Sequence, residues 1–207
     1  MYVPPKFALS NDQIADALRA ADMAYLVSAG AAGMVVTPLP MMYDAERHSL
    51  VGHVSRANSH WRDDVAGESV AIFGGVDGYI SPSLYAKKAE DGKVVPTWNY
   101  ETIAVYGQLQ VHDDTDWLRS HVTALSDSHE KRRSQPWSVD DAPDDFIDAQ
   151  LRGIIGVELS ITRWEGKAKM SQNQPERNQR SLIDGLAASR DLTDNLMAER
   201  VATYTDR

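Results

Sequence analysis

Three side chains that suit phosphate binding lie close together in the order Ser55, Arg56 and Asn58. They follow a predicted strand, and residues 57–64 are expected to form a short helical turn. Free amides at the start of a helical turn, together with a guanidinium fork, bind phosphate well. The same residue types also describe a capped turn with a surface arginine. The segment therefore predicts either a phosphate site, with His53 beside it, or an ordinary turn.

Aromatic rings gather with an amide in the segment that contains Trp98, Asn99 and Tyr100. Rings and amides of this kind can stack on a planar ring system and hydrogen-bond to its edge. A cluster of core aromatic residues is the alternative interpretation. The Ser-Pro-Ser sequence at residues 81–83 is typical of a turn.

Alternating lysines mark residues 164–173, a segment that we expect to be extended. Because successive side chains of a strand point to opposite faces, Lys167 and Lys169 are predicted to share one face. There they could meet an anion, or they could be solvated charges at a sheet edge. Ser171, Gln172 and Asn173 follow directly.

Several other kinds of site are excluded by the motifs that the chain lacks. The glycines of residues 74–78 do not match the dinucleotide fingerprint, and no Walker A sequence is present. The six histidines show no metal-ligand spacing. A Ser-His-Asp triad stays open, although there is no nucleophile elbow. The absence of cysteine excludes disulfides, thiolate metal sites and cysteinyl flavin attachment. We expect His112, His121 and His129 to be structural.

The composition is that of a globular chain of 207 residues with a formal net charge of −9. Such a charge argues against non-specific coating of nucleic acid, although residues 130–133 form a local basic run that is either a solvated helix end or a DNA contact. No apolar run approaches the ~18 residues that span a bilayer, so no membrane association is expected. With no signal peptide evident, the predicted location is cytoplasmic.

The hydrophobic pattern predicts about six strands, with helices concentrated toward the end of the chain. Strands are expected at residues 23–28, 34–43, 49–55, 69–73 with a continuation at 78–81, 100–112 and 154–164, with a turn at 30–33 and a loop at 86–93. Helices are expected at residues 10–22, 114–133, 143–152, 175–186 and 192–204. This order favours an α+β fold built on an antiparallel barrel, with residues 1–186 as the domain and 187–207 as a helical extension.

Two prolines, Pro38 and Pro40, interrupt one of these strands. Proline has no amide donor, so the strand must lie at an edge, form a bulge or open its ladder there. An opening of this sort leaves backbone groups available to a ligand. It also needs cover, which favours a homodimer.

Taken together, these segments resemble one known family, the PaiB-type FMN-binding proteins, which are described as negative transcriptional regulators. The resemblance runs from residue 1 to about Leu186. It is carried by residues 1–4, 52–58, 79–83, 95–100 and 169–173, with Thr-Trp-Asn-Tyr and Ser-Gln-Asn as the most specific blocks in combination.

The resemblance implies a split barrel with FMN in a groove between two subunits. Ser55 and Arg56 match the turn that holds the phosphate, whereas Asn58 stands near the place where many relatives carry a lysine. The backbone of residues 36–39, which include Thr37, Pro38 and Leu39, would face the isoalloxazine edge. The segment Ser171, Gln172 and Asn173, with Lys169, would close the site from the same or the second subunit.

Three functions remain open at this point. The first is a flavin-bound regulator that contacts DNA directly or through a partner protein. The second is an FMN-dependent oxidoreductase, in which His53 or Tyr100 could hold a proton near the ring. The third is haem binding, which requires an accessible ligand such as His53 or His60.

Overall fold

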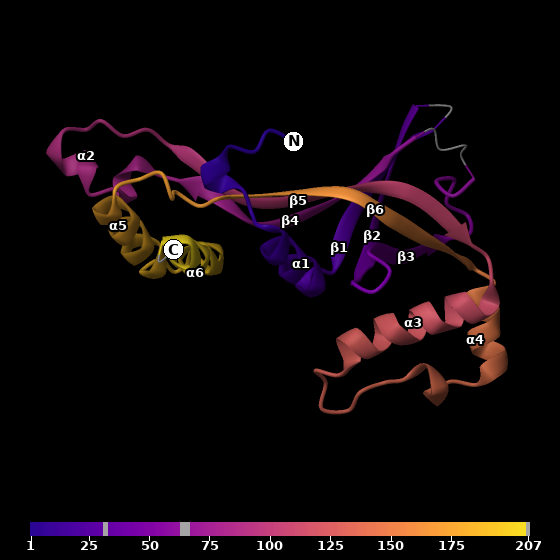
Figure 1. Cartoon of the computed structure of the whole chain (residues 1–207). Helices are drawn as coiled ribbons and strands as arrows, with labels where there is room; N and C mark the ends of the chain where they lie inside the picture. The colour runs from indigo at the N-terminus through magenta and orange to yellow at the C-terminus, as the bar shows by residue number, and fades with distance from the viewer. Residues whose placement is uncertain (31–32, 63–66, 206–207) are drawn as a thin grey trace. The chain divides into compact units, whose positions relative to one another are not determined.

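The computed structural model describes residues 1–30, 33–62 and 67–205 (Figure 1). The described strands close into a barrel in the order β1-β2-β3-β6-β5-β4, in which β1 and β2, β1 and β4, β2 and β3, and β3 and β6 pair antiparallel. The predicted antiparallel barrel with flanking helices is confirmed. The strands are β1 (Met23–Gly30), β2 (Gly33–Asp44), β3 (Ser49–Ser55), β4 (Ser69–Ile80), β5 (Thr97–His112) and β6 (Ile154–Lys169).

The five longer helices follow the sequence prediction, and one short helix is added to them. Residues 86–93 were expected to be a loop, but α2 forms one helical turn there. Helix α3 begins after Asp114, whose carboxylate accepts a hydrogen bond from the amide of Trp117 at 2.8 Å. The helices are α1 (Asn11–Ala20), α2 (Lys87–Glu90), α3 (Thr115–Glu130), α4 (Asp144–Leu151), α5 (Glu176–Ala187) and α6 (Leu192–Thr205), with 3₁₀ turns at Pro5–Phe7, Pro82–Leu84 and Val139–Asp141. Within the described residues no helix is both long and apolar enough to cross a bilayer.

The chain divides into two compact units, and strands β4, β5 and β6 each contribute one part to each of them. The first unit contains Met1–Asn11, Gly74–Ile103 and Glu165–Arg207. The second contains Asp12–Phe73 and Ala104–Trp164. The predicted division at residue 186 stays a prediction.

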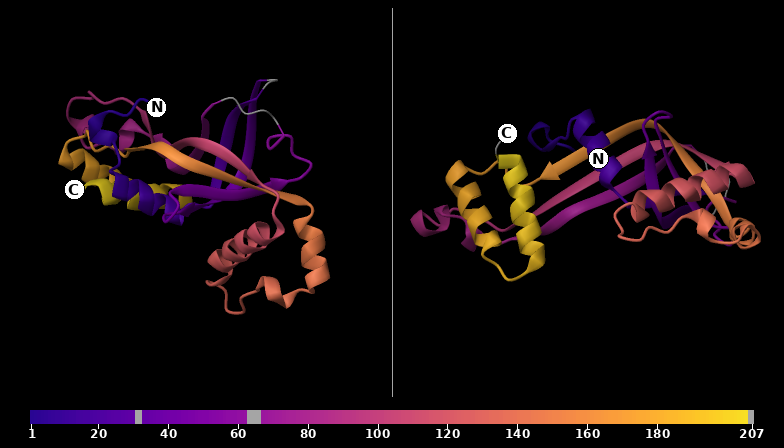
Figure 2. Two further views of the ribbon diagram at one scale, coloured as in Figure 1. Left: turned by 45° about the vertical axis from the view of Figure 1, so that its right-hand side comes forward. Right: turned by 90° about the horizontal axis from the view of Figure 1, so that it is seen from below.

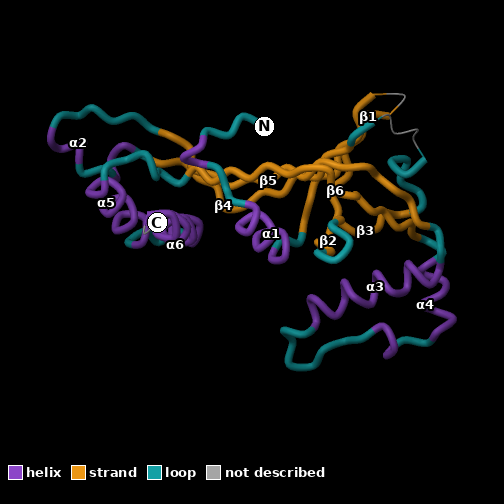
Figure 3. The backbone as a smooth tube through the Cα atoms, in the orientation of Figure 1, coloured by secondary structure: helices purple, strands orange, loops and turns teal. Residues whose placement is uncertain are grey.

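The second unit carries the barrel core, and its strands alternate as a half-buried sheet requires. Ala24 and Leu26 are buried, whereas Tyr25 between them is exposed. Between β5 and β6 the chain leaves the barrel as α3 and α4, which appear as one helical excursion in Figure 3. These helices share a small apolar cluster of Leu118, Val139, Ile147 and Leu151.

The first unit is built around the pair α5 and α6, which lie side by side in both views of Figure 2. Leu182 and Leu186 of α5 meet Met197 and Val201 of α6 in one buried cluster. The side of α6 that carries Met197 and Val201 is therefore covered within its own unit.

One predicted strand end is wrong. We expected the glycines Gly74 and Gly75 to end the fourth strand, but β4 continues through both of them to Ile80. A Cβ atom at Gly75 would lie 2.8 Å from that of Glu101, so glycine lets the two backbones approach. Gly75 therefore permits a close contact rather than a turn.

Two predicted turns lie partly outside the described residues. The turn at residues 30–33 includes residues 31–32, and the helical turn at 57–64 includes residues 63–64. The described part of the second segment is not a helix. It forms successive hydrogen-bonded turns, from the amide of Asn58 to the carbonyl of Ser55 and from the amide of Arg62 to the carbonyl of Ser59, each at 2.8 Å.

Candidate functional site

Strand β2 changes its hydrogen-bonding partner at the two prolines. Residues 33–40 pair with β1, whereas pairing with β3 begins only at Met41, opposite Gly52. Strand β3 pairs with β6 along its whole length, so beyond Gly52 it keeps this partner and loses β2. The strand itself is continuous, so the prolines do not break it, but the ladder toward β3 opens as the missing amides require.

Gly52 lies at the point where the two strands meet before they part. A Cβ atom there would stand 2.7 Å from the carbonyl oxygen of Pro40, which is closer than real Cβ contacts. Glycine is therefore the residue that allows this approach.

The opening between β2 and β3 contains a cavity of about 380 Å³. Its wall combines apolar side chains with a few hydrogen-bonding groups, as ligand pockets generally do. The end of α4 supplies Gln150, and the start of β6 supplies Ile154. Six residues predicted from the sequence line this cavity, namely Thr37, Pro38, Leu39, His53, Ser55 and Asn58.

A buried chain of hydrogen bonds runs from the cavity wall into the barrel. The Asn58 amide donates to the Thr37 hydroxyl at 3.2 Å, and that hydroxyl lies 2.9 Å from Nδ1 of His60. Nε2 of His60 lies 2.8 Å from the hydroxyl of Ser28, which is 2.7 Å from that of Ser69. Both ring nitrogens of His60 are thus engaged inside the protein, so His60 cannot ligate iron without breaking this chain.

Sequence reasoning missed Ser28 and Ser69 as supports of this wall. Both are polar residues at inward-facing positions of strands that otherwise bury apolar side chains. That break in the alternation is the signal that could have found them, because buried hydroxyls need partners.

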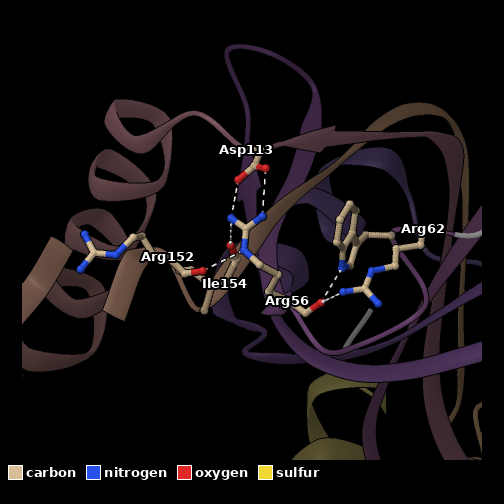
Figure 4. Close-up of polar contacts among 6 residues, drawn as sticks. Arg56, Arg62, Asp113, Arg152 and Ile154 are labelled. Carbon is tan, nitrogen blue, oxygen red and sulfur yellow. Dashed lines mark hydrogen bonds and ion pairs between the residues drawn. The ribbon is translucent and has the colours of Figure 1, made fainter. Parts of the chain in front are cut away.

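Arg56 directs its guanidinium toward Asp113 (Figure 4). Nη1 donates to Oδ2 of Asp113 at 2.9 Å and Nη2 donates to Oδ1. Nε donates to the carbonyl of Arg152 at 2.8 Å, and Nη2 also reaches that of Ile154 at 3.2 Å. This ion pair raises the pKa of Arg56 and lowers the pKa of Asp113. Arg56 therefore borders the cavity, through Ile154, but does not line it.

His53, on the cavity wall, forms a pair with His121 of α3. Nδ1 of His53 lies 3.1 Å from Nε2 of His121. Burial lowers the pKa of His53, and burial together with the nearby His53 lowers the pKa of His121 to about 4. Both rings are therefore neutral at pH 7. Trp117 stacks on His121 and on His112, with ring centroids 5.4 and 4.2 Å away.

The other predicted site residues meet in the first unit. The ammonium of Lys169 donates to the hydroxyl of Thr97 and to the carbonyl of Trp98. The hydroxyl of Ser171 donates to Oδ1 of Asn99 at 3.1 Å. The side-chain nitrogen of Asn99 is buried and has no partner among the described residues. Burial lowers the pKa of Lys169.

Gln172 and Asn173 differ in how their side chains are used. Gln172 accepts from the amide of Met170 and donates to the carbonyl of Ala168, each at 2.7 Å, so its side chain closes the turn after β6. Asn173 is exposed. The expected shared face of Lys167 and Lys169 is confirmed, since Ala168 between them is buried.

Residues 1–163 match the model of a family described as "Putative FMN-binding domain". The chain belongs to this family of FMN-binding proteins. It is 27% identical over 203 residues to "Protease synthase and sporulation protein PAI 2" of Bacillus subtilis, covering 96% of this chain and 95% of the relative. The predicted PaiB-type resemblance is confirmed, and FMN is the cofactor of this family.

Solved structures share the fold of this FMN-binding protein at low sequence identity. A conserved hypothetical protein, Rv2991 of Mycobacterium tuberculosis, matches with a TM-score of 0.60 and 11% identity, over 84% of this chain and 94% of that one. The "FAD and Heme binding protein" of Mycobacterium smegmatis matches with a TM-score of 0.55 and 16% identity, over 85% and 78%. These likenesses confirm the split-barrel fold.

The cavity suits the uncharged part of FMN better than its phosphate. Proline, leucine and valine side chains offer an apolar surface, and Thr37, Ser55 and Asn58 offer hydrogen bonds. No lysine or arginine of the described chain lines this cavity. Arg56 borders the cavity and is the residue there that best suits a phosphate. Its guanidinium is paired with Asp113 in this structure.

Proposed function

We propose that the cavity at the β2–β3 opening is where this protein holds FMN. The observation that carries the proposal is the loss of β2–β3 pairing at Pro38 and Pro40, which frees two strand edges in a chain of the FMN-binding family. The flavin ring would lie against the segment of residues 37–40, with His53 at its edge. Its phosphate would draw on Ser55 and on Arg56.

We further propose that the protein works as a homodimer. Support comes from one outer face of β1, β2 and β4, where large apolar side chains are exposed next to one another. Tyr25 pairs with Pro38 on one side and with Ile72 on the other, and Tyr25 is 58% exposed. Exposed apolar patches of this kind mark interaction surfaces. The face includes Met23, Tyr25, Met34, Val36 and Ile72.

A regulatory role is the function that we favour for the dimer. Its support is the resemblance to PaiB-type proteins, which are described as negative transcriptional regulators, and the similarity to "Protease synthase and sporulation protein PAI 2". With a net charge of −9, contact with DNA would be local, for instance through residues 131–133, or would pass through a partner protein. A cytoplasmic location agrees with this role.

An FMN-dependent oxidoreductase is the second candidate. Its support is the neutral imidazole of His53 on the cavity wall, which could hold a proton beside a bound flavin. When bound, FMN would supply the redox chemistry and the chain would bind and orient it. Haem binding ranks third. Both ring nitrogens of His60 are hydrogen-bonded, so of the two histidines predicted as iron ligands His53 is the one left.

A titration with FMN, followed by quenching of flavin fluorescence, tests the site. Saturation near one FMN per subunit supports it, and no binding at high micromolar FMN contradicts it. NADH or NADPH oxidation by the loaded protein then separates the functions. Sustained turnover favours the oxidoreductase, whereas its absence together with sequence-selective DNA retention favours the regulator.

A further inference from the structure

A second cavity lies between the β2–β3 hairpin and helix α3. Its volume is about 720 Å³, within the range of small-molecule sites. Val51 and Tyr43 of the hairpin face Trp117 and His121 of the helix across it. None of the residues predicted to bind FMN lines this cavity.

His121, which lines this cavity, carries a buried polar atom without a partner in the described part of the chain. Its side chain is only 6% exposed, and its Nδ1 atom has no hydrogen-bond partner among the described residues. Buried nitrogen atoms are nearly always hydrogen-bonded, and leaving one unpaired is destabilising. The atom therefore indicates a partner that comes from outside the chain.

The charges around the cavity favour a cation. Arg47 donates to the carboxylate of Asp44 at 2.9 Å, so these two charges offset each other. The backbone amide of Arg47 also lowers the pKa of Asp44, which keeps that carboxylate ionised. Asp116, in the first turn of α3, also lines the cavity, and no partner for its carboxylate is found among the described residues. One negative charge is left over.

We propose that this second cavity binds a planar cationic amine or amidine, whose N–H donates to Nδ1 of His121 and whose charge faces Asp116. An amidinium carries both a positive charge and several N–H donors in one plane. It therefore satisfies the buried nitrogen and the excess carboxylate together. A carboxylate ligand is an acceptor only, so it could pair with His121 only if Nδ1 carried the proton, and it would be repelled by Asp116.

The His53–His121 pair connects this second cavity with the cavity proposed for FMN. A neutral imidazole has one N–H, so one ring of the pair donates and the other accepts. A ligand that donates to Nδ1 of His121 fixes that ring's proton on Nε2, which then donates to Nδ1 of His53. The proton of His53 must then lie on its Nε2. This coupling rests on the proposed function, but binding at His121 does not.

Benzamidine is the probe, and benzoate, which has the same shape and the opposite charge, is its control. The ring nitrogens of His53 and His121 are followed by ¹H–¹⁵N NMR of the full chain, with and without FMN. We expect saturable benzamidine binding, a shift of the His121 nitrogens and protonation of His53 at Nε2, and no saturable effect of benzoate. Flavin fluorescence reports FMN binding separately, so failure at one cavity is distinguishable from failure at the other.

Two substitutions test the location. Ala124→Trp, at an exposed position of α3 that lines the second cavity, should abolish saturable binding, whereas Ala187→Trp on exposed α5 should not. His121→Phe keeps a ring but removes the nitrogen, and should weaken benzamidine about ten-fold, the value of one hydrogen bond to a charged group. Equal binding of benzoate, or binding that survives Ala124→Trp, overturns the proposed site. Bound benzamidine that leaves the His53 nitrogens unchanged overturns the coupling.

Discussion

Arg56 donates two hydrogen bonds to the carboxylate of Asp113, although the two residues are 57 positions apart in the chain. The same guanidinium also donates to the carbonyls of Arg152 and Ile154, so it connects the end of β3 with the start of β6. A phosphate at the neighbouring cavity would compete with Asp113 for this side chain. The pair is therefore the natural place to test the phosphate assignment.

The first prediction concerns this competition. Arg56→Ala should weaken FMN at least about ten-fold if the guanidinium reaches the phosphate. Asp113→Asn removes the competing charge and should tighten FMN binding. Flavin fluorescence titration measures both, with Arg19→Ala, which removes an exposed arginine paired with Asp16, as the control. An FMN affinity that is unchanged in Arg56→Ala would contradict the phosphate role. Arg56 would then only connect β3 with β6.

Strand alternation made much of the barrel predictable, and the two prolines correctly indicated the place where the ladder opens. Partners across the fold were not predictable in the same way. The contact of His53 with His121, like that of Arg56 with Asp113, depends on the register of β3 and on how α3 returns to the barrel. Neither is encoded in the local pattern. Gly75 in β4 was wrongly predicted to end the strand, because a close backbone approach and a turn both favour glycine.

The second prediction concerns the buried chain behind the cavity wall. His60→Phe removes the acceptor and donor that connect Thr37 with Ser28, and leaves buried hydroxyls with fewer partners. We expect a loss of about 2 kcal/mol in the free energy of unfolding, from urea denaturation. His129→Phe, at a half-exposed position, should change it little. Equal losses in both variants would contradict a special role for His60.

The third prediction follows from the lowered pKa of His121. Its folded-state pKa of about 4 lies below the ordinary value of 6.5, so the unfolded chain takes up a proton first as the pH falls. The stability that His121 contributes is therefore present above pH 6.5 and is lost as the pH falls toward 4. The gap is worth about 3 kcal/mol at most, at about 1.4 kcal/mol for each pH unit.

Urea unfolding between pH 4 and pH 7 measures this dependence. In His121→Phe the free energy of unfolding should depend less steeply on pH over that window. The decrease corresponds to at most one proton taken up on unfolding. His53, whose pKa is also lowered by burial, should keep part of the slope. A variant with the full original slope would show that another group carries the pH dependence.

The fourth prediction concerns the apolar face of β1 and β2. Tyr25→Glu or Val36→Glu places a charge in the middle of this face and should convert the dimer to a monomer. Light scattering after size-exclusion chromatography gives the mass directly. Phe146→Glu, which changes an equally exposed ring on α4, should leave the dimer intact. A wild-type chain that is already monomeric at working concentration would contradict the dimer proposal itself.

The last prediction concerns Gly52 at the mouth of the cavity. In Gly52→Ala the new methyl group would stand 2.7 Å from the carbonyl oxygen of Pro40, so one of the two strands must shift. We expect a loss of about 1–3 kcal/mol in stability, the usual cost of overpacking. FMN binding should weaken as well, because Pro40 lines the cavity.

Gly74→Ala is the matched control, since its Cβ atom would meet nothing within 4 Å in the same kind of backbone. Urea unfolding and FMN titration of both variants separate a local clash from a general cost of replacing strand glycine. If Gly52→Ala keeps both its stability and its FMN affinity, the strands can separate freely at Pro40. The cavity would then not depend on their close approach.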